Sequence, residues 1–219
     1  MPSLSIATVS AARQIERRDW ERLAPDGHPF LDADFFTLME QHETAGPACG
    51  WHAHHRVATN PDGAVVGLVP TYIKSNSHGD FVRDWSWAAA YQQLGKTYYP
   101  KLLSGVPHTP ASGPRFLVAA GSDSDQVRTR LIEHIKASVA ESGFSSWHVA
   151  LPTDNEVELL RANGLLVSHD VQFHWRDHGY GDFDGYLAAF PSAKRRKVKA
   201  ERRRVGENGL TIEVRHGNE

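Results

Sequence analysis

The chain has 219 residues, of which 40% are apolar and 10% aromatic, so it can bury a core and is not a disordered segment. Its net charge of -2 hides a basic run at 194–204, with eight Lys and Arg against one Glu, and a remainder with 16 basic and 25 acidic residues. This remainder, at -9, excludes a protein that coats a polyanion over its whole surface. The lone Cys49 cannot form an internal disulfide, and no apolar run reaches 18 residues. We therefore expect a cytoplasmic protein without a transmembrane segment and without DNA as a partner.

The first third of the chain predicts a strand, two helices and a hairpin. Alternation indicates the strand, and apolar residues at helical spacing indicate the helices. The hairpin turn is Pro61-Asp62-Gly63, in which Pro fixes φ and Gly supplies a positive φ. The expected elements are a strand at 5–9, helices at 11–23 and 32–43, and hairpin strands at 54–60 and 64–74.

The rest of the chain alternates between helical and strand patterns. Residues 84–118 are rich in aromatic residues, Pro and Gly, so we expect the least regular part of the fold and a pocket wall there. The order of elements predicts a mixed α/β sheet flanked by helices. The expected elements are a helix at 122–143, a strand at 145–151, a helix at 155–164, a strand at 165–175, a helix at 184–205 and a strand at 210–214.

Metal and phosphate signatures are weak. His52 and His54 would share one strand face and His55 the other, but no third ligand follows at zinc-site spacing, so we expect no metal site. There is no GxxxxGK[ST] or GxGxxG motif. The helix at 122–143 begins with Asp123 and Asp125, which disfavour a pyrophosphate at that end.

The aromatic and proline-rich segment combines apolar walls with a few cationic groups, as small-molecule and glycan sites do. His108 and Thr109 lie between Pro107 and Pro110, in a stiffened loop. The simpler interpretation is that most of these aromatic rings belong to the core. The candidate substrate-binding residues of this segment are Trp87, Tyr91, Tyr98, Tyr99, Lys101, Thr109 and Arg115.

Several distinctive segments occur in order along nearly the whole chain: DGAVVGLVPTYIKSNSHGDFVRD, WAAAY, YYPKLLSGVPHTPASGPRFL, VQFHW and FDGYLAAF leading into KRRKVKAER. Together they resemble the FemAB-like proteins of the GNAT superfamily, the group described as peptidoglycan biosynthesis/recognition. The resemblance implies a GNAT-like, largely antiparallel sheet and acyl or aminoacyl transfer. In Fem-type proteins a basic residue tends to precede the central Gly-Pro, whereas here Ser112 precedes Gly113-Pro114 and Arg115 follows.

The resemblance also implies a domain division and substrates. We expect a GNAT-like domain at 1–182, followed at 183–219 by an interdomain helix and the first strand of an incomplete second domain. No bound cofactor is expected; acyl-CoA or aminoacyl-tRNA is the possible co-substrate, and a small molecule or cell-wall precursor is the acceptor. His174, in the QFHW motif, joins the candidate substrate-binding residues.

A transfer mechanism needs a neutral amine, a group that accepts its proton, and donors for the carbonyl oxygen. The implied fold would place the acyl carbonyl near 101–115, and the ordinary pKa of His108 would suit a proton relay there. The simpler interpretation of His108 is a loop histidine bonded to backbone. Two other functions stay open: a non-catalytic module that binds glycans or cell-wall precursors, and an RNA-binding protein that uses 194–204.

The basic run itself has helical spacing, with Leu187, Phe190, Val198 and Val205 on one stripe. We expect Pro191 to kink or restart this helix. It resembles the helix that joins the two halves of Fem-type proteins, so its cations would meet an anionic substrate or charged tRNA. Exposed Val198 and Val205 would favour a homodimer through this helix. The alternative is a solvated helix face. The cations proposed to contact substrate are Lys194, Arg195, Lys199 and Arg202.

Overall fold

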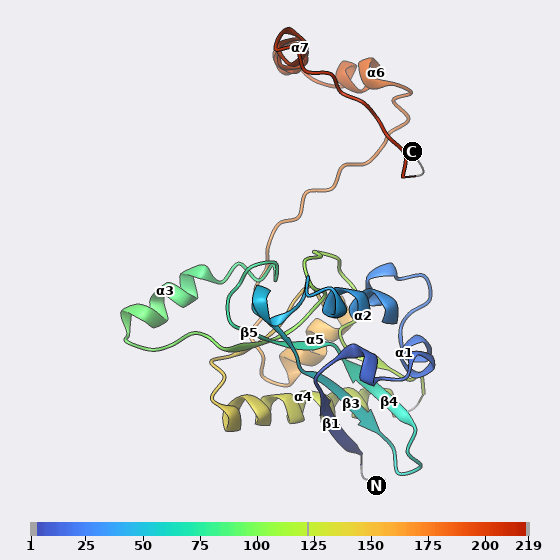
Figure 1. Ribbon diagram of the computed structural model, residues 1–219, viewed down its shortest axis with the longest axis vertical. Coiled ribbons are helices and arrows are strands. Elements are labelled where there is room, and N and C mark those ends of the chain that lie inside the picture. The colour runs from blue at the N-terminus through green and yellow to red at the C-terminus, as the bar shows by residue number, and fades with distance from the viewer. Residues whose placement is uncertain (1–3, 122, 218–219) are drawn as a thin grey trace. The chain divides into compact units, whose positions relative to one another are not determined.

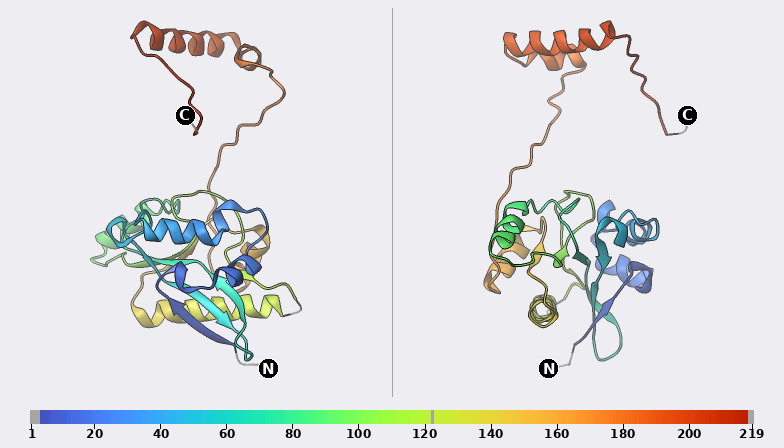
Figure 2. Two further views of the ribbon diagram at one scale, coloured as in Figure 1. Left: turned by 45° about the vertical axis from the view of Figure 1, so that its right-hand side comes forward. Right: turned by 60° about the vertical axis from the view of Figure 1, so that its left-hand side comes forward.

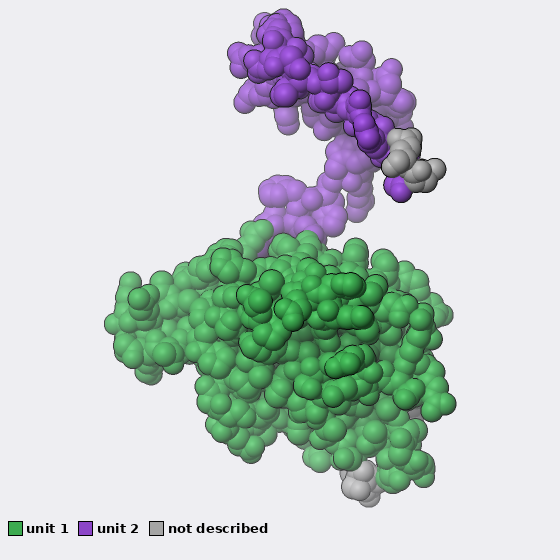
Figure 3. Space-filling model, in the orientation of Figure 1, with its two compact units in different colours: residues 1–168 green, residues 169–219 purple. Residues whose placement is uncertain are grey.

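The computed structural model describes residues 4–121 and 123–217, and its chain divides into two compact units (Figures 1 and 3). The first unit ends at Ser168, and the second begins at His169. The division expected after residue 182 falls inside the second unit. The sheets and the central cores lie in the first unit.

Two four-stranded sheets form the first unit. The strands of the first sheet are all antiparallel, whereas the second sheet contains one parallel pair, β6 with β8. In spatial order the first sheet holds β1 (Ser5–Val9), β3 (His55–Thr59), β4 (Val65–Val69) and β7 (Leu117–Val118). The second holds β2 (Trp51–Ala53), β5 (Thr71–Lys74), β6 (Lys101–Ser104) and β8 (Trp147–Val149).

One long hairpin supplies strands to both sheets. Its turn is the predicted one, with Gly63 at φ 81° and Asn60 N–H bonded to the Ala64 carbonyl at 3.0 Å. One arm contains β2 and β3, and the other contains β4 and β5; the arms change sheet at His54 and Pro70. Proline has no N–H for a ladder, so a strand break at Pro70 follows from its chemistry. The two arms stay joined there by His54 N–H and the Thr71 carbonyl, at 2.8 Å.

Helices cover both faces of these strands (Figure 2). One core cluster contains Trp20 and Phe36 from α1 and α2, and the other contains Leu131 and Ile135 from α4. The alternation of strand side chains divides neighbours such as Leu102 and Leu103 between the two clusters. The α/β fold class with a mixed, largely antiparallel sheet is therefore confirmed. The helices are η1 (Ala12–Gln14), α1 (Arg17–Leu23), η2 (Pro29–Leu31), α2 (Ala33–Gln41), η3 (Pro47–Cys49), α3 (Trp85–Gln93), α4 (Ser124–Ser142), α5 (Asp154–Ala162), α6 (Phe183–Ala188) and α7 (Ser192–Glu207).

Local signals set several of the helix ends. Asp32 accepts a hydrogen bond from Asp34 N–H at the start of α2, and Thr153 forms a capping box with Glu156 in α5. Gly143 takes the left-handed conformation that ends α4. The predicted first residue of that helix, Ser122, lies outside the described residues.

Three expectations were wrong. The segments predicted as strands at 165–175 and 210–214 form no strand, because no described strand pairs with either. Apart from the half-buried Leu165 and Val167, their apolar side chains are exposed. A strand gains most of its stability from its neighbours, which periodicity does not reveal. The aromatic segment contains a regular helix, α3, where we expected irregular structure. By contrast, the interruption expected at Pro191 is present, between α6 and α7.

Candidate functional site

One face of the second sheet carries a row of unusual side chains. Lys74 of β5 lies opposite Trp51 of β2 on one side and opposite Lys101 of β6 on the other. His148 of β8 lies opposite Leu103, so period-2 alternation puts it on the same face as Lys101. The row therefore consists of an indole, two lysines and an imidazole on four adjacent strands.

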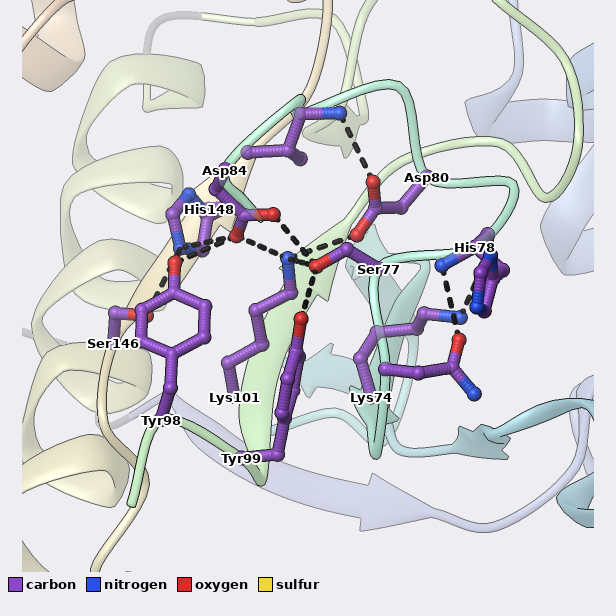
Figure 4. A network of polar contacts seen from close by, with 12 residues as sticks. Lys74, Ser77, His78, Asp80, Asp84, Tyr98, Tyr99, Lys101, Ser146 and His148 are labelled. Atoms are coloured by element: carbon purple, nitrogen blue, oxygen red, sulfur yellow. Dashed lines mark hydrogen bonds and ion pairs between the residues drawn. The ribbon is translucent and has the colours of Figure 1, made fainter. Parts of the chain in front are cut away.

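Lys101 is the centre of a buried charge cluster (Figure 4). Its Nζ lies 2.8 Å from Asp80 Oδ2 and 2.9 Å from Ser77 Oγ, and it forms a very short contact with Asp84 Oδ2. Asp84 also accepts hydrogen bonds from the hydroxyls of Ser77 and Tyr98, each at 2.6 Å. Burial would raise the pKa of Asp84, but the hydrogen bonds from Lys101, Ser77 and Tyr98 outweigh it, so the pKa is below its ordinary value.

His148 lies at the partly exposed edge of this cluster, with 24% of its side chain accessible. Its Nε2 is 2.9 Å from Ser146 Oγ, 3.1 Å from Tyr98 Oη and 3.7 Å from Asp84 Oδ2. Burial and the nearby Lys101 cation lower the pKa of His148 to about 4. Its imidazole is therefore neutral near pH 7. Burial and the Asp84 carboxylate raise the pKa of Tyr98, so that hydroxyl stays protonated.

Lys74 has no such neutralising partners. Its Nζ lies 3.5 Å from the centroid of the Trp51 ring and donates to the His78 carbonyl at 3.2 Å. Among the described residues no carboxylate lies within ion-pair distance of it. Burial, with a further contribution from Lys101, lowers the pKa of Lys74 to about 7 although Asp80 opposes the shift. A pKa of about 7 leaves roughly half of the Lys74 side chains uncharged at neutral pH.

The structure brings three of the sequence-predicted residues into this cluster. Lys101 and Tyr98 are described above, and Tyr99 Oη lies 2.8 Å from Ser77 Oγ. The Tyr91 ring, on α3, packs edge-on against Tyr98 with centroids 5.1 Å apart. Trp87 lies on the same helix but is 61% exposed and outside the cluster.

His108 and Thr109 lie in a loop beside the Trp51 end of the row. The His108 ring is 5.3 Å from the Trp51 ring, and its Nε2 is 3.0 Å from the Thr44 carbonyl. Because the carbonyl can only accept, that hydrogen bond requires a proton on Nε2, and the nitrogen left to accept a proton is Nδ1. Nδ1 lies against Gly79, so closely that a Cβ on residue 79 would be 2.2 Å from it. Thr109 donates from its hydroxyl to the Pro107 carbonyl at 3.0 Å.

Arg115 is a buried connector away from the charge cluster. Its Nε donates to the Ala150 carbonyl at 2.7 Å, and its backbone N–H donates to the Glu156 carboxylate at 2.8 Å. Burial lowers the pKa of Arg115 to about 10, although the Glu156 charge opposes the shift. In this arrangement the guanidinium joins the loop before β7 to the end of β8.

The remaining predicted residues lie in the second unit. His174 is exposed, with Nε2 3.0 Å from Gln172 Oε1. Val198 and Val205 are half-buried. The four proposed cations contact their own unit: Lys194 lies over the Phe190 ring, Arg195 donates to the Phe190 carbonyl, Lys199 pairs with Asp184 at 3.3 Å, and Arg202 lies over the Phe183 ring.

Sequence reasoning missed Ser77, Asp80, Asp84 and His148. Asp80 lies in a Gly-containing turn after β5, and Asp84 immediately precedes α3; acidic residues are ordinary at both kinds of position. The available signal was the alternation within TYIK and KLLS, which places Lys74 and Lys101 on a face otherwise occupied by buried residues.

Among the described residues, no group of three or more His, Cys, Asp or Glu side chains is arranged to hold a metal ion. Likewise, no helix in that part of the chain has the length and apolar character needed to span a bilayer.

The fold and site define an α/β protein with a buried lysine-carboxylate cluster. The family model of the FemAB-like proteins, described as peptidoglycan biosynthesis/recognition, matches residues 11–219, and the chain belongs to this family. No curated protein matches it.

Two solved acetyltransferase structures are similar over about four fifths of the chain. The aminoglycoside 6'-N-acetyltransferase AAC(6')-Ih of Acinetobacter baumannii is 10% identical with a TM-score of 0.46, covering 81% of this chain and 100% of that one. The ribosomal-protein-alanine N-acetyltransferase of Brucella melitensis biovar Abortus is 12% identical with a TM-score of 0.43, covering 80% and 100%.

Proposed function

We propose that this protein is an N-acyltransferase that moves an acyl or aminoacyl group from acyl-CoA or aminoacyl-tRNA to an amine acceptor, with cell-wall precursors as the acceptor class. Membership of the FemAB-like family over 11–219 supports the general class. The observation that carries the proposal is the partly exposed, neutral imidazole of His148, which lies 3.7 Å from the buried Asp84 carboxylate.

The chemistry needs a proton acceptor of this kind. When the amine attacks the acyl carbonyl, a C–N bond forms and the nitrogen of the tetrahedral adduct carries an extra proton. Such an ammonium is strongly acidic, so even a weakly basic imidazole can accept its proton. The Asp84 charge would stabilise the resulting imidazolium. Collapse of the adduct breaks the C–S or C–O bond to the donor, and the proton passes to the leaving thiolate or alkoxide.

His108 stays the second candidate for the proton acceptor, and the substrate roles of Trp87, Tyr91, Thr109 and Arg115 stay proposals. If aminoacyl-tRNA is the donor, α7 is the element that would bind it. Apart from the half-buried Arg195, the cations of that helix are exposed.

Mass spectrometry of amine acceptors incubated with acyl-CoA or charged tRNA tests the proposal. We expect product with the wild type and a loss of about 100-fold or more with His148→Gln. His42→Gln, at an exposed position on the first unit, is the matched control and should retain activity. Persistent absence of product from folded protein with both donor classes would contradict the transferase function. If product formation is lost with His108→Gln but not with His148→Gln, the proton acceptor is His108 of the loop.

A non-catalytic glycan-binding function is the second candidate. It is favoured by two exposed indoles on α3, Trp85 at 57% and Trp87 at 61% exposure, because stacking on aromatic rings is a common way to bind sugars. Glycan binding that is lost in Trp85→Ala and Trp87→Ala, together with no transfer product, would establish this function instead.

A further inference from the structure

The outer edge of β2 has no neighbouring described strand, because β1 pairs only with the β3 part of the same hairpin arm. β1 pairs with β3 up to Val9, which lies opposite His55. Beyond that point the N–H groups of Ser10 and Ala11 bond to the Gln14 side chain, at 2.8 and 3.2 Å, and the chain turns into η1. β1 therefore ends before it reaches β2, and among the described strands β2 pairs with β5 alone.

The backbone groups of β2 alternate between its two edges. His54 N–H bonds to the Thr71 carbonyl, and Ser75 N–H bonds to the Gly50 carbonyl, so the even-numbered residues of this arm face β5. Trp51 and Ala53 therefore direct their N–H and C=O groups to the other edge. Trp51 N–H is bonded to the Gly46 carbonyl at 3.1 Å. For Ala53 N–H and C=O, no partner is found across that edge among the described residues.

A cavity of about 620 Å³ lies along the same edge. Its size is typical of ligand cavities in proteins. Small residues line much of it, including Ala11, Ala45 and Gly46, together with Ala53 of the strand itself. Trp51 also lines the cavity, and its ring lies against Lys74 at 3.5 Å, so the cavity adjoins the row of lysines.

We propose that this cavity binds an extended peptide with small side chains, which adds to the edge of β2 as a further strand. The backbone of an extended peptide carries one C=O and one N–H that can pair with the N–H and C=O of Ala53, and strand addition is an established mode of peptide recognition. The small lining residues allow its backbone to approach closely. This binding site is distinct from acyl transfer, so either can hold when the other fails.

A free peptide fits this edge better than a strand from a second copy of the chain. The strand is only three residues long, the outward N–H of Trp51 is already bonded to Gly46, and Ser10, Ala11, Gly46 and Pro47 line the cavity beside it. Edge-to-edge dimers use long exposed strands. A short peptide can enter this space, whereas a strand held within a folded domain would collide with these walls.

Amide hydrogen exchange of the full chain, measured by NMR with N-acetyl-penta-alanine amide as the probe, tests the proposal. We expect exchange at Ala53 N–H to slow by about tenfold at saturation, because the bound peptide accepts a hydrogen bond from it. A tenfold slowing corresponds to about 1.4 kcal/mol. Exchange at His52 N–H, which faces β5, should not change. The same peptide methylated at every nitrogen lacks the donors that a strand needs and should have no effect.

Ala53→Pro removes the outward N–H without removing a bond to β5, so it should fold and should bind the peptide at least about tenfold more weakly. The methylated peptide keeps the test valid if this variant does not fold. No slowing at Ala53 up to the solubility limit of the peptide would overturn the proposal. Equal effects of the two peptides, or slowing that depends only on protein concentration with a doubled mass, would also overturn it.

Discussion

Two groups of lysines in this molecule, on α7 and on the second sheet, differ in their exposure and in how their charge is compensated. On α7, eight cations follow one another along a helix, and nearly all are exposed. On the second sheet only two lysines occur, Lys74 and Lys101, and both are fully buried. Lys101 is neutralised by two carboxylates, whereas Lys74 rests on an aromatic ring.

This difference shows that the density of charge in a sequence does not locate the strongest electrostatics. Exposed ion pairs on α7 are screened by water, as with Lys197 and Glu201 at 3.9 Å. A buried charge must be paired or must change its protonation state, and the two sheet lysines illustrate these two outcomes. Perturbed groups of this kind concentrate at functional sites.

The largest expected effect is at Lys101. Lys101→Met leaves Asp80 and Asp84 buried without their cation, so we expect a loss of about 3–5 kcal/mol in the free energy of unfolding. Urea denaturation measures it. Lys197→Met, at a 76% exposed side chain on α7, is the matched control and should change the value by less than about 0.5 kcal/mol. Adding Asp80→Asn and Asp84→Asn to the first variant should restore part of the loss; equal effects at Lys101 and Lys197 would refute the comparison.

Glu156 tests whether the same contrast holds for acids. Its carboxylate accepts hydrogen bonds from the N–H groups of Arg115 and Phe116 at 2.8 Å each, in a buried position. Glu156→Ala leaves these two N–H groups without an acceptor, and we expect the free energy of unfolding to fall by about 2–4 kcal/mol. Glu158→Ala, on the same helix at 69% side-chain exposure, should cost much less in the same denaturation experiment. A small effect at Glu156 would mean that water replaces its carboxylate.

Lys74 predicts a pH dependence of stability. The pKa of Lys74 is about 7 in the folded chain, against 10.5 for an ordinary lysine, so the unfolded chain binds more protons between these values. The free energy of unfolding should therefore gain an increasing contribution from this group as pH rises from about 7 to 10.5, and no such gain below pH 7. In Lys74→Met this contribution should be absent. Urea denaturation across pH 6–10 measures it, and a slope identical to that of the wild type would contradict the lowered pKa.

The smallest expected effect is on α7. Lys199→Ala removes an exposed ion pair with Asp184 at 3.3 Å. We expect the free energy that stabilises α7 to change by less than about 1 kcal/mol, and by less still at high salt. Helicity by circular dichroism at low and high salt measures it. A large, salt-independent loss would show that α7 depends on its cations as strongly as the sheet depends on Lys101.

Sequence reasoning succeeded where structure depends on nearby residues. The Pro61-Asp62-Gly63 turn, the long helix ending at Gly143 and the interruption at Pro191 follow from local chemistry, and the structure contains all three. The segment 165–175 failed because a strand requires a partner elsewhere in the chain.

The site shows the same limit. Tyr98, Tyr99 and Lys101 were found because they are concentrated in an aromatic and proline-rich segment. Asp84 and His148 were not, because only the pairing of β6 with β8 and the path of the chain after β5 bring them to Lys101. Local patterns predict which residues could form a site, but the tertiary fold determines which residues surround the buried charge.

The long hairpin that enters both sheets also bears on how the first unit unfolds. In one arm β2 of the second sheet continues into β3 of the first, and in the other arm β4 of the first sheet continues into β5 of the second. Neither sheet can therefore separate without disrupting both arms of the hairpin. Units that open together in native-state hydrogen exchange are contiguous and cooperative. We therefore expect the two sheets to exchange their central amides as a single foldon, with one opening free energy shared by Val57 and Tyr72, although these residues belong to different sheets.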